Sequence, residues 1–89
     1  MKTERVTLCN RLGLHARAAS KLVSTAAEFQ SNVMVVREDK RVNAKSIMGV
    51  LMLAAPVGTE LEIECDGPDE EDALKALAAL IQDRFGEAE

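Results

Sequence analysis

The sequence has almost no aromatic residues: two phenylalanines, and neither tryptophan nor tyrosine, occur among its 89 residues. Its core must therefore be aliphatic. Positive charge is also scarce, because 15 acidic against 11 basic residues leave a net charge of −4, which argues against a nucleic-acid partner. The longest apolar run, residues 50–57, is too short to span a bilayer, and residues 1–5 show no hydrophobic signal region. We therefore expect a cytoplasmic protein that does not insert into membranes.

Cysteine and histidine are scarce as well. Cys9 and Cys65 form no Cys-x-x-Cys motif, and His15 is the only histidine, so the residues for a plausible zinc site are missing. Two cysteines without a signal region are typical of free thiols in a reducing compartment. We expect no disulfide, no metal and no cofactor.

The hydrophobic pattern predicts a single α+β domain, residues 1–89. The chain has no repeat, linker or low-complexity segment, and its length allows one core with little surplus stability. Strand and helix patterns alternate in the order β-α-β-β-α-β-α. The expected strands are residues 5–9, 33–36, 40–43 and 60–65, and the expected helices are residues 16–29, 47–53 and 70–85.

The clearest strand, residues 60–65, alternates strictly between glutamates and apolar residues. One face of the sheet must therefore be buried while the other meets water. The parity of the strands places Cys65 in the core and Cys9 on the outer side.

Helix ends are also marked in the sequence. Ser46 and Asp69 each stand where an N-cap is needed. Gly86 is expected at the C′ position of the last helix, and residues 86–89 are expected to fray.

The pattern changes from strand to helix around His15. Gly13 relaxes the backbone just before it, and apolar residues take helical spacing from Ala16 onward. His15 should therefore lie at the first helical turn, where free N–H groups and the positive end of the dipole favour an anion. That field favours a neutral imidazole with a lone pair for attack, and Arg17 offers a charged fork for phosphate oxygens. The alternative interpretation is a polar histidine without chemistry.

Two stretches resemble the HPr family, the histidine-containing phosphocarriers of the phosphoenolpyruvate-dependent sugar phosphotransferase system. Gly13-Leu14-His15-Ala16-Arg17 resembles the family's active-site signature, and Lys45-Ser46-Ile47-Met48-Gly49-Val50 resembles its regulatory-serine segment. The resemblance extends from about residue 3 to residue 85. Ala18 departs from it, because most members have proline there. Since alanine is the better helix former and adds one N–H to the first turn, we do not interpret the change as loss of function.

The resemblance implies both a fold and a mechanism. The fold would be an open-faced β-sandwich, with a four-stranded antiparallel sheet in the order 1-4-2-3 covered on one face by three helices. His15 would accept a phosphoryl group from enzyme I, at Nδ1, and pass it to enzyme IIA components, while Arg17 stabilises the phosphate. Such a carrier is itself the covalent intermediate rather than an enzyme.

The same resemblance implies regulation and docking. HPr kinase/phosphorylase would phosphorylate Ser46, although a serine at a helix start is most often only a cap. The partner enzymes would bind a monomer across the two helices near His15. The expected contact residues are Ala16, Ser20, Ile47, Met48 and Leu51, beside Arg17.

Two alternative functions stay open at this point. One is a regulatory binding module that keeps the fold and Ser46 but carries no phosphate. The other is a carrier in a nitrogen-related phosphotransfer branch, which would keep the chemistry and change the partners.

Overall fold

The computed structural model describes residues 1–89 and shows one antiparallel sheet with helices on one of its faces. In chain order the elements are β1 (Lys2–Thr7), α1 (Ala16–Ala27), β2 (Asn32–Arg37), β3 (Lys40–Asn43), α2 (Ile47–Leu51), β4 (Glu60–Asp66), α3 (Glu70–Gln82) and the 3₁₀ turn η1 (Arg84–Gly86). The strand order is β1-β4-β2-β3, with every neighbouring pair antiparallel. The expected α+β sandwich is confirmed.

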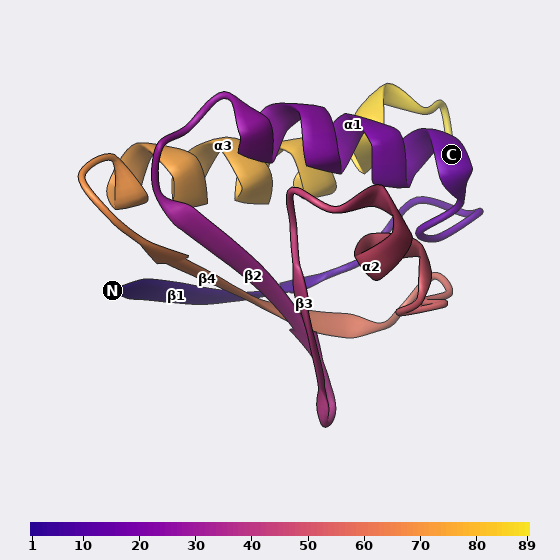
Figure 1. Ribbon diagram of the computed structural model, residues 1–89. Helices are drawn as coiled ribbons and strands as arrows, with labels where there is room; N and C mark the ends of the chain where they lie inside the picture. The colour runs from indigo at the N-terminus through magenta and orange to yellow at the C-terminus, as the bar shows by residue number, and fades with distance from the viewer.

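The helices bring the start of α1 and the C-terminus to the same end of the molecule. Helices α1 and α3 pack against each other along the sheet, and α2 packs against α1 (Figure 1). The C-terminus lies at the end of the molecule where α1 begins (Figure 1). No helix combines the length and the apolar character that crossing a membrane requires.

Strand β4 shows the expected separation of faces. Leu61, Ile63 and Cys65 are fully buried, and each fully buried aliphatic side chain contributes about 1.5–3 kcal/mol. Cys65 lies in the core as the parity of β4 predicted. The prediction for Cys9 is wrong, because this exposed residue lies beyond the end of β1 and its thiol donates to the Ile81 carbonyl of α3 at 3.4 Å. Burial raises the pKa of the Cys65 thiol.

Several element boundaries differ from the expected ones, and three of the differences are of two residues or more before the last helix. Strand β1 is Lys2–Thr7 rather than residues 5–9, α1 ends at Ala27 rather than at residue 29, and α2 ends at Leu51 rather than near residue 53. The polar residues at the start of β1 carry no hydrophobic signal, but they pair with β4 along their whole length, from Lys2 opposite Cys65 to Thr7 opposite Glu60. Pairing with β4 therefore sets the start of β1, which the alternation of apolar residues does not predict.

The expected cap at Asp69 is also wrong. Asp69 stands at the N-cap position of α3, but its side chain forms no capping bond. Its carboxylate instead accepts hydrogen bonds from the backbone N–H of Gln30 and from the N–H and hydroxyl of Ser31. These bonds, the Ser31 side chain first, lower the pKa of Asp69. The residue therefore fastens the connection between α1 and β2.

The last residues of the chain contact the loop before α1 and the N-cap residue of α1. Helix α3 ends at Gln82, so Gly86 is not its C′ residue. Arg84 and Phe85 both have a positive φ, and this bend buries the Phe85 ring in the core. The amino group of Lys21 donates a hydrogen bond to the Phe85 carbonyl at 2.6 Å. The buried ring thus holds the last residues against the start of α1.

Candidate functional site

Backbone packing fixes the position of His15. It is the N-cap residue of α1, with extended backbone angles (φ −79°, ψ 179°). Gly13 just before it has φ +67°, and a Cβ on this residue would lie 2.6 Å from the carbonyl oxygen of Ala55. The N–H of Leu14 donates to that same oxygen at 2.9 Å. Only glycine allows so close an approach, so the loop before His15 is held by its contact with residues 55–56.

One nitrogen of the His15 ring is hydrogen-bonded within the protein and the other is not. Nε2 forms a hydrogen bond with Oε2 of Glu87, a residue of the C-terminal segment. The side chains of His15 and Glu87 are 28% and 14% exposed, so both are partly sheltered from water. The His15 side chain makes no capping bond to α1, and Nδ1 has no hydrogen-bond partner in the protein.

The first turn of α1 keeps its backbone donors free. The first bond inside the turn is from the N–H of Ala19 to the carbonyl of His15, at 2.8 Å. The N–H groups of Ala16, Arg17 and Ala18 precede it and have no acceptor in the protein. The Arg17 side chain is exposed and takes part in none of the salt bridges. This end of the helix can therefore receive an anion.

A hollow of about 620 Å³ lies over this region. Its lining residues come from the loop before α1, the first turn of α1 and the end of the chain: Arg11, Leu12, His15, Ala16, Arg17, Glu87, Ala88 and Glu89. His15 and Arg17, which the sequence singled out, therefore share one cavity with a segment that was expected to fray.

Helix α2 carries the predicted regulatory and docking residues. The Ser46 hydroxyl accepts a hydrogen bond from the N–H of Gly49 at 3.2 Å, which confirms the expected cap. Ser46 is exposed. Val50 is the buried residue of this helix, whereas Ile47, Met48 and Leu51 are 39%, 68% and 37% exposed. Ala16 and Ser20 are exposed on the neighbouring α1.

Sequence reasoning missed two residues of this site, Glu87 and Asn10. Asn10 is fully buried, and its Nδ2 donates to the Gly13 carbonyl at 2.7 Å and to Oε1 of Glu87 at 3.0 Å. The hydrogen bond from Asn10, followed by that from His15, lowers the pKa of Glu87. A glutamate among the last residues of an acidic tail carries no local signal of such a contact.

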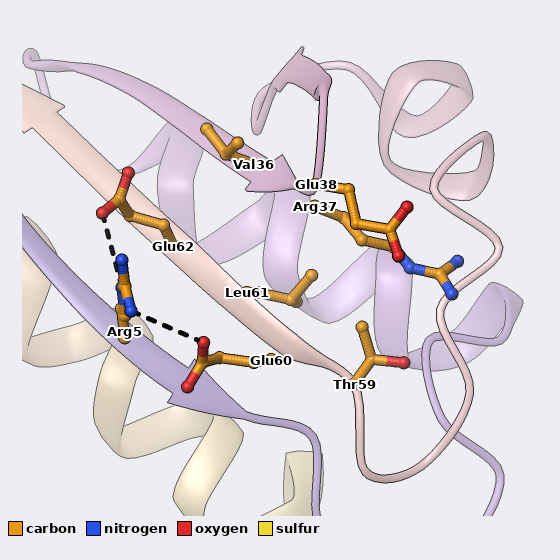
Figure 2. A pocket seen from close by; sticks show the side chains of 8 residues that line it. All are labelled: Arg5, Val36, Arg37, Glu38, Thr59, Glu60, Leu61 and Glu62. Carbon is orange, nitrogen blue, oxygen red and sulfur yellow. Dashed lines mark ion pairs between the residues drawn. The ribbon is translucent and has the colours of Figure 1, made fainter.

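A second hollow, of about 480 Å³, lies on the other side of the sheet. Figure 2 shows Arg5 between Glu60 and Glu62, at 3.8 and 3.9 Å from their carboxylates. Arg37, also in this hollow, donates to the carbonyl of Leu53 at 2.7 Å. Its cations are already engaged and no histidine or cysteine lines it, so the hollow at His15 is the better candidate.

Comparison with known proteins shows the family to which the chain is related. A family model described as the PTS HPr component phosphorylation site matches residues 2–83. The chain is 52% identical over 89 residues to the phosphocarrier protein HPr of Neisseria meningitidis, with 100% of both chains covered. It is 55% identical over 83 residues to the phosphocarrier protein HPr of Cupriavidus necator, with 93% of each covered.

The fold agrees in the same way. The crystal structure of HPr from Thermoanaerobacter tengcongensis superposes with a TM-score of 0.97, at 44% identity and with 100% of both chains covered. On the family match and this likeness along the full length of its relatives, the chain belongs to the PTS HPr component family.

Proposed function

We propose that this protein is a phosphocarrier of the phosphotransferase system. His15 accepts a phosphoryl group from phosphorylated enzyme I, which phosphoenolpyruvate has charged, and passes it to an enzyme IIA component. The observation that carries the proposal is the state of the His15 ring, in which Nε2 faces the Glu87 carboxylate and Nδ1 is unpaired. An ionised carboxylate only accepts hydrogen bonds, so Nε2 holds the proton and Nδ1 keeps the lone pair.

The start of α1 supplies what the transferred group needs. Three free N–H groups and the exposed Arg17 guanidinium are available to its anionic oxygens. A hydrogen bond to a charged group contributes about 1.5–3 kcal/mol. Because these donors are uncommitted in the free protein, no internal bond has to break when the phosphoryl group arrives.

The protein is the covalent intermediate of the transfer and not a catalyst that turns over a small substrate. Residues 1–89 act as one unit, and their hollow offers His15 to one partner after another. The partly exposed ring, whose Nδ1 is unpaired, suits this exchange, because donor and acceptor must both reach the same nitrogen in turn.

The exposed part of α2 serves docking and regulation in this proposal. Ile47, Met48 and Leu51 are exposed apolar side chains on α2, the helix that packs against α1, and Ala16 and Ser20 are exposed on α1. Flexible methionine side chains adapt to more than one partner. Phosphorylation of Ser46 by HPr kinase/phosphorylase adds about −1.5 to −2 charges at this surface. It thereby opposes a partner that carries a negative phosphoryl group.

The test is the mass of the intact protein after incubation with enzyme I and phosphoenolpyruvate. We expect one added phosphoryl group that mild acid removes, as for phosphohistidine. His15→Ala should abolish the addition while the protein stays folded, because this side chain belongs to no part of the core. Arg17→Ala should slow the addition about tenfold without abolishing it, since the backbone donors remain.

Two results would reject the phosphocarrier. One is a parent protein that gains no mass, and the other is a phosphoryl group that persists in acid and in the His15→Ala variant. The first result would favour the regulatory binding module. Binding of the unphosphorylated protein to a partner through Ser46 and α2 would then be its remaining activity.

A further inference from the structure

The last residues of the chain are built into the site by contacts along their length. The buried Phe85 anchors the segment, and Lys21 binds the Phe85 carbonyl at 2.6 Å. The N–H of Arg11 donates to the backbone carbonyl of Glu89 at 2.9 Å, and the two side chains pair at 3.2 Å. Glu87, which lies between these anchors, has little freedom to leave His15.

Both carboxylate oxygens of Glu87 are engaged by different partners. Oε1 accepts from the buried Asn10 amide at 3.0 Å, and Oε2 faces Nε2 of His15. Asn10 is itself fixed by the loop, because the same amide donates to Gly13 at 2.7 Å. The buried Asn10 amide therefore orients the carboxylate, so that Oε2 faces the imidazole.

We propose that Glu87 is a positioning residue for phosphoryl transfer. It keeps the proton on Nε2, so that Nδ1 is the nucleophile, and it faces the positive charge that the ring gains on phosphorylation. This inference rests on the proposed function and adds to it a residue from the end of the chain.

The chemical step shows where this carboxylate acts. The Nδ1 lone pair of His15 forms a bond to phosphorus as the N–P bond of the donor phosphohistidine breaks, and the electron pair of that bond returns to the donor nitrogen. No proton has to leave His15, because Nδ1 carries none and Nε2 keeps its own. The ring thereby acquires one positive charge, next to the Glu87 carboxylate. An acid that orients a histidine and balances its charge in this way is familiar from hydrolase triads.

The charges around Glu87 favour its ionised form. Lys21 adds a positive contribution to the hydrogen bonds that lower the pKa of Glu87. Arg11, Arg17 and Glu89 are the other charged groups that line the hollow. Because Arg11 and Glu89 pair with each other, Arg17 is the cation left for the phosphoryl group, and Glu87 is the anion left for the ring.

The direct test is the ¹⁵N spectrum of the His15 ring in the full-length protein, recorded at a pH where the ring is neutral. We expect the parent protein to show a protonated Nε2 and an unprotonated Nδ1. In Glu87→Ala both ring signals should move toward the average of two exchanging tautomers. The same preparations are then phosphorylated by enzyme I under single-turnover conditions, across a range of pH.

We expect Glu87→Ala to slow phosphorylation about tenfold, the lower end of the loss that follows when the carboxylate behind a metal-ligating histidine is removed. Glu87→Gln keeps one acceptor oxygen, which can serve Nε2–H or the Asn10 amide but not both in this geometry, and it loses the charge. Its rate should fall between those of the parent and of Glu87→Ala. Glu28→Gln is the matched control, since it removes one exposed carboxylate at the far end of α1. Its ring signals and rate should equal those of the parent.

The inference is overturned if the parent ring carries its proton on Nδ1, or if both Glu87 variants match the parent in ring signals and in rate. The ring signals of Phe85 report whether Glu87→Ala loosens the end of the chain. If it does, the test rests on Glu87→Gln alone, and phosphorylation of that variant at the parental rate overturns the inference. A parent protein that accepts no phosphoryl group would instead reject the phosphocarrier, while the ring spectrum would still decide the tautomer.

Discussion

The first turns of α1 and α2 are built in opposite ways. At α2 the Ser46 hydroxyl accepts a hydrogen bond from the N–H of Gly49, so this short helix satisfies one of its own free donors. At α1 the corresponding residue is His15, which makes no such bond and turns its ring toward Glu87. A capping serine is typically worth about 1 kcal/mol. Helix α1 forgoes that stabilisation, and its donors stay available for chemistry.

The start of α3 gives a third outcome at the same kind of position. Asp69 is a good capping residue by type, yet its carboxylate binds Gln30 and Ser31 on the neighbouring connection. Glu70 instead reaches back, and its Oε1 accepts from the N–H of Gly67 at 3.1 Å. Residue type predicts that a polar side chain near a helix start will accept hydrogen bonds from backbone N–H groups. Tertiary packing determines whether those N–H groups belong to that helix or to a neighbouring segment.

The largest expected difference in stability between the two helix starts comes from replacing their glycines, Gly13 before α1 and Gly49 in α2. Gly13 has φ +67°, and a Cβ there would lie 2.6 Å from one backbone atom and 2.9 Å from two others. Gly13→Ala should lower the free energy of unfolding by at least about 2 kcal/mol, because left-handed strain and a backbone clash add. Urea unfolding measures this change, and the rate of phosphoryl acceptance should fall with it as His15 shifts.

Gly49 is the matched control for this change. It has no positive φ, and a Cβ there would meet Val42 Cβ at 3.4 Å and Ser46 Oγ at 3.5 Å, which are ordinary contacts. Gly49→Ala should stabilise α2 by about 0.5–1 kcal/mol. If both substitutions cost the same, the loop before His15 is not held by its contact with residues 55–56.

The cap of α2 and its charge can be separated with two substitutions at Ser46. Ser46→Ala removes the bond to Gly49 and should cost about 1 kcal/mol in urea unfolding. Ser46→Asp keeps a capping oxygen and adds a negative charge that the helix N-terminus tolerates. It should therefore stay close to the parent in stability while enzyme I phosphorylates it more slowly, most clearly at low salt.

The opposite pattern would contradict this division of roles. An Asp variant that unfolds as easily as the Ala variant, but accepts phosphate at the parental rate, would mean that the cap matters and the charge does not. Ser46 would then be a structural residue only.

Local patterns in the sequence were enough for the order of the strands and helices and for the place of His15, but not for the bounds of β1. The alternation in β4 and the change of period at Ala16 are signals that a single segment carries by itself. The contact between Glu87 and His15 depends on the bend at Arg84 and Phe85, which places an apolar ring in the core. Positive φ at two residues that are not glycine has no sequence signal, so the contact of Glu87 with His15 was not predictable.

The smallest expected effect distinguishes the start of α3 from that of α2. The hydrogen bonds from Ser31 and Gln30 lower the pKa of Asp69. Its ionised form is thus favoured in the folded protein, and the stability it contributes is present above the ordinary carboxyl range, near pH 4. That contribution is lost as the pH falls through the lowered folded pKa. Asp69→Asn should therefore lose stability at neutral pH and show a flatter decline in acid than the parent.

Hydrogen exchange locates this effect in the molecule. If Asp69 serves the connection between α1 and β2, Asp69→Asn should speed exchange of the Gln30 and Ser31 amides, which donate to the carboxylate at 2.9 Å each. The first-turn amides of α3 should exchange as in the parent, because Asp69 makes no capping bond to them. Faster exchange in the first turn of α3, with Gln30 and Ser31 unchanged, would mean that Asp69 caps its own helix as Ser46 caps α2.

The Ser31→Ala variant is an independent check on Asp69. It removes the hydroxyl that lowers the pKa of Asp69 most, so acid unfolding should begin at higher pH than in the parent.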